Sequence, residues 1–380
     1  MGLFEKIFGS KEPTGKGGGY FQTLTAYSPV FSSWNGELYE SELVRAAIDA
    51  NARHASKLKV EFIGAARPDL RRKMNHAPNA FQTWGQFLYR TMTILMMQNT
   101  AFIVPVKDEE SMGGFYTVLP TRCEVVQYNG EPWIRYNLST GQVAAVPMAE
   151  CGVLTRFQYK SDFFGETNRA LSPTMSVVDL QNQAIKEAVS SGATFRFSAQ
   201  LSNFAKAEDI AKERKRFNST QLSKDGGGIL LFPNTYSNIQ QLKPNNFTVE
   251  TEQMNFIKSN VFNYFGVNEE VLQNKAYGDA WSAFYEGSIE PFAIQLSDVL
   301  TKMTYTQREQ TQGSQVIATS NRLQYLSNTE KLNVSAQMAD RGIMSVNEIR
   351  EIWNLSPVEG GDERVIRGEY KAAEEATNGD

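Results

Sequence analysis

The sequence predicts an α+β fold, and three features of its 380 residues carry this prediction. Apolar residues recur at helical spacing over residues 42–58 and 81–97. Short runs rich in branched and aromatic residues follow at 101–106, 115–119, 123–128 and 132–137, which is typical of strands. Longer helical patterns then occupy much of the second half of the chain. Hydrophobic residues make up 41% of the sequence, which is enough to bury a sizeable core.

The first 170 residues begin with a segment that we expect to be a flexible arm. Residues 1–24 include the glycine-rich stretch KEPTGKGGGY, which has little to bury. The helix over residues 42–58 follows, and Ser41 is placed to cap its start with Glu42 in the first turn. Asn129-Gly130, between the last two predicted strands, favours a two-residue hairpin.

Two further helices are predicted around a central charged segment. Ser172-Pro173 predicts a helix start, and this helix runs to about residue 191. A second helix over residues 250–265 ends at Gly266, which suits a left-handed cap. The polar stretch 267–279 that follows reads as a loop.

The remaining helices carry two clear local signals. The helix over residues 280–304 contains Pro291, and a kink is expected there because proline removes one backbone hydrogen bond. Near the end of the chain, Ser345 and Glu348 are spaced as a capping box. From Pro357 onward the chain is acidic.

A charged helical patch covers residues 206–224, before two short predicted strands at 229–232 and 239–242. Its basic residues outnumber its acids by six to three: Lys206, Lys212, Arg214, Lys215, Arg216 and Lys224 against Glu208, Asp209 and Glu213. The simplest interpretation is a solvated helix face, and the alternatives are contact with an acidic protein or with DNA. The whole chain has a net charge of −4, so it is not a protein that grips DNA phosphates over a wide surface.

No motif in the sequence indicates catalysis, a cofactor or a metal. The two histidines, His54 and His76, are interpreted as structural, with His76 in a loop, and no zinc spacing, phosphate-binding loop or nucleophile elbow is present. Cys123 and Cys151 can pair, but a reducing cytoplasm at the time of folding is the simpler interpretation. No signal peptide is evident, and the most apolar stretch, residues 91–106, is too short to span a membrane.

The stretch FNYFGVNEEVLQNKAYGDAWSAFYEGSIEPFAIQLSDVL at residues 262–300 resembles a signature of the HK97-like tailed-bacteriophage portal protein family. Phe265-Gly266-Val267 matches the family's turn, Leu272 part of its loop and Pro291 its kink. The chain differs in having Asn268-Glu269 where prolines are common.

A second resemblance is the stretch ADRGIMSVNEIREIWNLSPVEGGDE at residues 339–363, which is similar to the C-terminal motif of the same family. Weaker similarity covers residues 43–57, 95–108 and 171–184, in the family's order. The chain is therefore identified as a member of this family over about residues 40–365.

The resemblance implies a portal protein, a head–tail connector that forms a ring, usually a dodecamer, at one capsid vertex. Double-stranded DNA passes through such a ring during packaging and ejection. The implied partners are the terminase large subunit, the head–tail adaptor and the major capsid protein, with no membrane. The implied location is the virion, and the host cytoplasm during assembly. The implied parts are the arm 1–24, the wing 25–172 and 280–330, the stem helices 173–192 and 249–265, the clip 193–248, the tunnel loop 266–279 and the crown with its acidic tail 331–380.

Two groups of candidate site residues follow from these parts. The tunnel loop places polar residues nearest to DNA, with Lys275 the foremost candidate: Asn268, Gln273, Asn274, Lys275 and Tyr277. The clip would meet an acidic surface on the motor or adaptor through its basic residues: Lys212, Arg214, Lys215, Arg216 and Lys224.

Two other classes of function compete with a portal. One is a different virion structural protein, such as a head–tail adaptor or a capsid subunit. The other is an enzyme, such as a nuclease or hydrolase that uses scattered acids. The length and the paired helices with a loop between them favour the portal, and the missing catalytic motifs count against an enzyme.

Overall fold

The computed structural model describes most of the chain between residues 41 and 366. The described residues are 22–23, 41–108, 111–137, 143–192, 196–201, 208, 210–212, 214–216, 236–242, 251–320, 328–364 and 366. They divide into two compact units, an inserted unit at Pro173–Ile257 and a body formed by Met1–Ser172 with Lys258–Asp380. Helices and antiparallel sheets occur in both units, so the predicted α+β class is confirmed.

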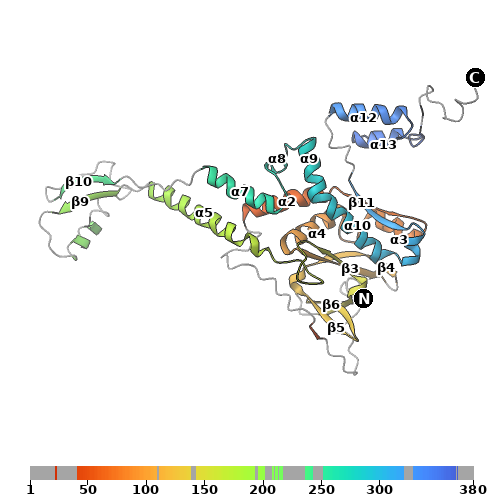
Figure 1. Cartoon of the computed structure of the whole chain (residues 1–380), viewed down its shortest axis with the longest axis horizontal. Helices are drawn as coiled ribbons and strands as arrows, with labels where there is room; N and C mark the ends of the chain where they lie inside the picture. Colours follow the sequence, from red (N-terminus) through yellow and green to blue (C-terminus); the bar gives the residue numbers. More distant parts are fainter. Residues whose placement is uncertain are drawn as a thin grey trace, which may run out of the picture. The chain divides into compact units, whose positions relative to one another are not determined.

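Two antiparallel sheets lie in the lower part of the body in the view of Figure 1. The strand order of one sheet is β1 (Gln22–Thr23), β5 (Cys123–Tyr128), β6 (Glu131–Asn137) and β7 (Val143–Pro147). The order of the other is β4 (Ser111–Val118), β3 (Thr100–Asp108) and β8 (Gly152–Thr155). All four predicted strands of this region are present. Strand β1 lies inside the stretch predicted as an arm, because it pairs with the edge of β5.

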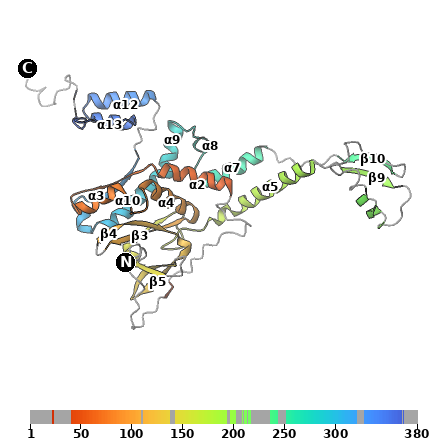
Figure 2. The same ribbon diagram turned by 180° about the vertical axis from the view of Figure 1, so that it is seen from behind.

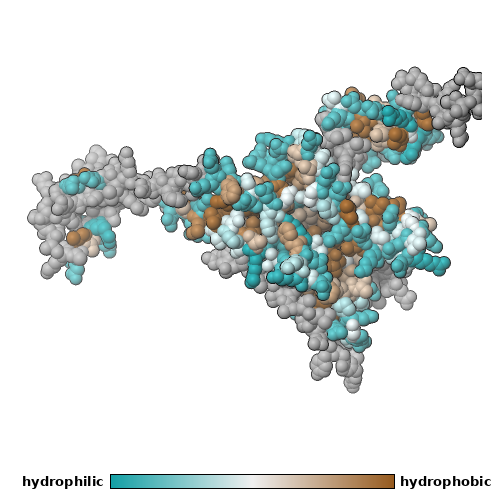
Figure 3. Space-filling model, in the orientation of Figure 1, coloured by the Kyte–Doolittle hydropathy of each residue, from teal (hydrophilic) through white to brown (hydrophobic). Residues whose placement is uncertain are grey.

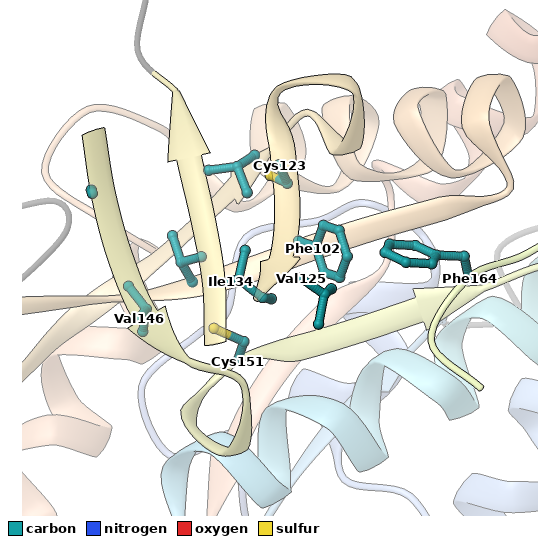
Figure 4. Packing of buried hydrophobic residues seen from close by; sticks show 10 residues of the cluster. Phe102, Cys123, Val125, Ile134, Val146, Cys151 and Phe164 are labelled. Atoms are coloured by element: carbon teal, nitrogen blue, oxygen red, sulfur yellow. The ribbon is translucent and has the colours of Figure 1, made fainter. Parts of the chain in front are cut away.

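The apolar core of these sheets includes both cysteines (Figure 4). Phe102 and Phe164 meet edge to face within it, with ring centroids 5.7 Å apart. Cys123 and Cys151 are buried there as free thiols, so they do not pair. Burial raises the pKa of the Cys123 thiol well above its usual range, which keeps the side chain uncharged in an apolar site.

The hairpin between β5 and β6 turns at the predicted dipeptide. Asn129 has a φ of 50° and Gly130 a φ of 84°, the pair of positive angles that a type I′ turn requires. Tyr128 and Glu131 face each other across the turn. The turn residues therefore fix the register of these two strands.

Helices α2 (Glu42–Ala55) and α4 (Trp84–Gln98) lie side by side in the body (Figure 2). Ser41 occupies the N-cap position of α2 as predicted, but its side chain makes no capping hydrogen bond. Helix α4 begins three residues later than predicted because Thr83 and Gln86 form a capping box at its start.

The elements that were not predicted from the sequence include two paired strands and a short helix. Strand β2 (Lys59–Ile63) pairs antiparallel with β11 (Gln315–Thr319), more than 250 residues away. Helix α3 (Pro68–His76) begins with proline in its first turn, where the missing N–H costs nothing. The prediction that His76 lies in a loop is therefore wrong, because it is the last residue of this helix.

The long helix around Pro291 is interrupted one turn before the proline. It consists of α9 (Asp279–Phe284), a π-helical segment at Tyr285–Ile289 and α10 (Glu290–Thr304). Proline lacks an N–H and its ring crowds the carbonyl four residues earlier, so the preceding turn widens. The predicted disruption thus takes the form of a π-helical segment in the turn before Pro291.

The C-terminal helices α12 (Asn328–Asp340) and α13 (Val346–Ile352) form a small pair, and hydrophobic side chains reach its surface (Figure 3). The predicted capping box of Ser345 and Glu348 is present. The side chain of Asn347 binds the segment that follows α13, which includes the end of the C-terminal motif at residues 357–362. Its amide accepts from Val358 N at 2.8 Å and donates to Asp362 Oδ1 at 2.8 Å, which holds the chain after α13 against that helix.

The remaining elements complete both units. The inserted unit contains β9 (Arg196–Leu201), β10 (Tyr236–Leu242) and all but the first residue of α5 (Ser172–Gly192), whose predicted bounds are confirmed. Helix α7 (Thr251–Tyr264) crosses the boundary between the units. The body also contains two short helices, α8 (Glu269–Leu272) and α11 (Gln307–Thr311), and 3-10 turns at Pro120–Arg122, Met148–Glu150 and Asn168–Leu171. The predicted strand 229–232 lies outside the described residues. Within the described part of the chain, no helix is both long and apolar enough to cross a membrane.

Candidate functional site

The tunnel loop begins at a complete C-cap of helix α7. Gly266 has a φ of 67°, the left-handed conformation predicted for it. The N–H of Val267 donates to Phe262 O at 3.0 Å, and that of Gly266 donates to Asn263 O at 3.1 Å. These two hydrogen bonds form a Schellman motif, and the burial of Val267 accompanies it. The direction in which the chain leaves α7 is thereby fixed.

Two side chains from other helices anchor this cap. The buried Asn51 of α2 donates from Nδ2 to Phe265 O at 2.9 Å. Ser288, in the π-helical segment, donates from Oγ to Gly266 O at 2.8 Å. Both carbonyls lie at a helix end, where no later N–H of the helix can reach them. The start of the loop is therefore held by α2 and by the long helix together.

The stretch 267–279 is not simply a loop, because it contains the one-turn helix α8. Asn268 caps this helix, accepting from Val271 N at 2.8 Å. A second Schellman motif closes it: Asn274 is left-handed with a φ of 57°, and Lys275 N donates to Glu270 O at 2.8 Å. Asn268 and Asn274, both predicted as channel residues, thus also determine the backbone.

All five predicted channel residues are exposed, and the structure brings them together on one short segment. Gln273 donates to Glu269 Oε1 at 3.0 Å and accepts from Lys275 Nζ at 2.9 Å. Tyr277 is 70% exposed. Such a surface offers hydrogen-bonding groups of both kinds and a single ammonium group, so it is polar without being strongly basic.

A hydrogen-bond network beneath the end of α7 was missed from the sequence. Tyr264 donates from its hydroxyl to Asn168 Oδ1 at 2.7 Å, and Asn99 donates to the same oxygen at 2.7 Å. Arg156 donates from Nη2 to Tyr264 O. Burial lowers the pKa of Arg156 and raises that of Tyr264. The partners in these contacts are 69 to 108 positions apart in the sequence, and no local pattern connects them.

His54 is a structural histidine, as interpreted from the sequence. It lies on α2 and meets Phe284 edge to face, with ring centroids 5.2 Å apart. Burial, followed by the nearby charges of Lys57 and Arg53, lowers the pKa of His54 to about 4. The imidazole is therefore neutral at pH 7, which suits its place against an aromatic ring.

The basic clip segment is described only in part. Lys212, Arg214, Lys215 and Arg216 are helical and exposed in the inserted unit. Lys224 lies outside the described residues. The predicted contact of these residues with a protein partner therefore stays a prediction.

Comparison with known proteins identifies what this arrangement resembles. The family described as "Phage portal protein" matches residues 42–354. Two solved chains share the fold. One comes from the neck of the empty gene transfer agent (GTA) particle computed with C6 symmetry, and the other from the neck of the native particle computed with C12 symmetry. Their TM-scores are 0.55 and 0.55 and their sequence identities 14% and 15%; both alignments cover 85% of this chain and 92% of the other. An HK97 family phage portal protein from Corynebacterium diphtheriae gives a TM-score of 0.49 at 12% identity, over 74% of this chain and 93% of that one. No curated protein sequence matches.

Proposed function

Because the chain belongs to the phage portal protein family, we propose that its copies close into a ring at one vertex of a capsid and that double-stranded DNA passes through the centre. A portal protein is a structural component of the virion and not an enzyme. The family match over residues 42–354 carries this proposal. It also favours a portal over the two other virion proteins considered, an adaptor and a capsid subunit.

The finer division of the ring follows the order of the elements. Residues 25–172 and 280–330 would form the wing, 173–192 and 249–265 the stem, 193–248 the clip and 331–380 the crown. The start of the inserted unit at Pro173 supports the boundary between wing and stem. Within the ring, the tunnel loop at residues 266–279 would reach the DNA.

The chemistry of the tunnel loop suits a channel in which a polyanion must slide. Phosphate contacts through Lys and Arg dominate DNA affinity, so a strongly basic lining would hold the DNA in place. The loop instead has one Lys275 against three acids, Glu269, Glu270 and Asp279, together with exposed amides. Its two helix caps hold these side chains on a fixed backbone, so repeated copies would present the same polar lining at every position.

Electron microscopy of the purified full chain tests the ring directly. We expect negative-stain images to show rings with a central hole wide enough for duplex DNA. An isometric shell would instead indicate a capsid subunit. A protomer at all concentrations and salt conditions, together with virions that lack the chain, would refute the proposal.

Lys275 offers a test of the tunnel loop. We expect Lys275→Ala to change DNA packaging or retention while rings still form, because the variant removes one ammonium group per copy at the channel. Lys302→Ala is the matched control, since Lys302 is also exposed but lies on α10. Packaging and retention equal to wild type in the Lys275 variant would remove this residue from the channel.

Charge reversal tests the clip. We expect Arg214→Glu with Arg216→Glu to weaken binding to the adaptor or to the packaging motor, because both proposed contacts require an acidic partner surface. Lys186→Glu on α5, also exposed, is the control. Equal affinity in a pull-down or calorimetric titration would assign the basic residues to a solvated helix face.

A further inference from the structure

A cavity of about 650 Å³ opens beside the end of α7 in the body. Its walls are mostly apolar and come from α4, α7 and α10: Met92, Met96, Phe265, Pro291 and Phe292. Arg156 and Phe157, which follow strand β8, close one side. The cavity is large enough to receive a bulky side chain or a short peptide segment.

Arg156, in the cavity wall, has a hydrogen-bond donor without a partner. Its Nη2 donates to Tyr264 O, but Nη1 is buried and has no hydrogen-bond partner. The guanidinium also lies over three aromatic rings, the nearest being Phe157 at 4.3 Å from its centroid. A buried donor without a partner is costly, so a group that accepts from Arg156 would gain more than an ordinary surface hydrogen bond.

The aromatic loop, residues 156–166, exposes two large side chains next to this guanidinium. Phe157 is 47% exposed and Tyr159 is 83% exposed. Phe157 also has a φ of 53°, a left-handed conformation that is unfavourable for a bulky residue. Aromatic residues and arginine are the side chains that dominate binding energy in protein interfaces. The loop therefore has the composition of an interface centre.

Hydrogen bonds within the aromatic loop hold its backbone in place. Gln158 donates from Nε2 to Asp162 O at 2.9 Å, and Glu166 N donates to Phe157 O at 2.9 Å. Ser161 accepts from Phe163 N at 3.3 Å. A loop that is already ordered loses little entropy when a partner covers it.

The charge of the loop favours a protein over DNA as the partner. Arg156 and Lys160 are balanced by Asp162 and Glu166, so the net charge is zero. We propose that the aromatic loop and the cavity are an interface between neighbouring copies of this chain, which rests on the proposed ring. In a closed ring each copy uses two different surfaces, so the cavity on one copy would receive a projection from the next. The projection would present an apolar group together with a carbonyl or carboxylate that accepts from Arg156.

A double variant tests this interface in the full chain. Phe157→Asn with Tyr159→Ser removes both exposed rings, and asparagine tolerates the left-handed backbone better than phenylalanine. We expect the protomer to melt at the wild-type temperature, while the concentration at which rings dissociate rises at least about tenfold. Phe81→Asn is the control, because Phe81 is 58% exposed elsewhere on the body. Mass photometry over a dilution series measures the protein concentration at which half of the rings have dissociated.

A second variant keeps the inference testable if the double variant does not fold. Gly287→Leu adds a side chain at the cavity wall, where an added Cβ meets no atom within 4 Å. It should disrupt rings, whereas Ser282→Leu on the exposed face of α9 should not. Wild-type dissociation midpoints in both test variants would overturn the interface and leave the ring intact. If the wild-type chain never forms rings, the proposed function fails and the interface fails with it.

Discussion

The tunnel loop and the aromatic loop both contact the end of α7, yet they expose opposite chemistry. The tunnel loop is held by two Schellman motifs and exposes amides, carboxylates and Lys275. The aromatic loop is held by Gln158 and Glu166 and exposes Phe157 and Tyr159. Each backbone is fixed, so the exposed side chains decide what each loop can bind. Polar groups suit a surface over which DNA slides, and aromatic groups suit one that a protein covers.

The largest effect should come from the aromatic loop. Gly165→Ala places a Cβ 2.1 Å from Arg156 O and 2.2 Å from Asn99 O. Both are backbone carbonyls that cannot move without opening the network under α7. We expect a loss of about 3 kcal/mol in the free energy of unfolding, measured by denaturant titration. A loss below that of the tunnel-loop glycine described next would show that the aromatic loop is the less rigid of the two.

The corresponding change in the tunnel loop should cost less. Gly266→Ala puts a non-glycine residue at a φ of 67°, and its Cβ lies 2.5 Å from Ser288 Oγ. The hydroxyl belongs to a side chain that can rotate, although rotation breaks its hydrogen bond to Gly266 O, so the costs are the left-handed backbone and that bond. We expect a loss of about 1–2 kcal/mol by the same titration. Stability equal to wild type would mean that this cap does not hold the tunnel loop.

His54, on helix α2 beside the tunnel loop, should make the free energy of unfolding depend on pH. Its folded pKa of about 4 lies below the usual 6.5, so the unfolded chain binds more protons between these values. The contribution is complete above pH 6.5 and is lost as pH falls toward 4. Allowing for solvent screening, we expect it to be about 1 kcal/mol. The melting temperature of the His54→Gln variant should change less between pH 6.5 and pH 5 than that of the wild type. His76→Gln should leave this pH dependence unchanged. Equal pH slopes in both variants would contradict this assignment.

The smallest effect should come from the caps of α8. Asn268→Ala removes the side chain that accepts from Val271 N, and about 1 kcal/mol should be lost locally. Asn274→Gly keeps the left-handed conformation and should leave the loop almost unchanged. Hydrogen exchange at residues 269–275 measures both. Faster exchange in the glycine variant than in the alanine variant would reverse our account of how α8 is held.

Sequence reasoning succeeded where a local signal has one physical meaning. Asn129-Gly130 gave the hairpin, Gly266 the helix end and Ser345 with Glu348 the capping box. It was incomplete at Pro291, because the residue predicts a disruption but not its form as a π-helical segment. It treated residues 267–279 as a loop because a one-turn helix has too few residues to show periodicity.

The sequence by itself determined the α+β class, most helix ends and the family, since these depend on neighbours within a few residues or on an ordered set of motifs. Only the tertiary structure decided that β2 pairs with β11, that Asn51 anchors the tunnel loop and that Arg156 meets Tyr264. Those contacts join residues from 108 to 260 positions apart. Many side chains with a hydrogen-bond donor could satisfy a distant carbonyl, so which one does so is fixed only when the helices and sheets pack.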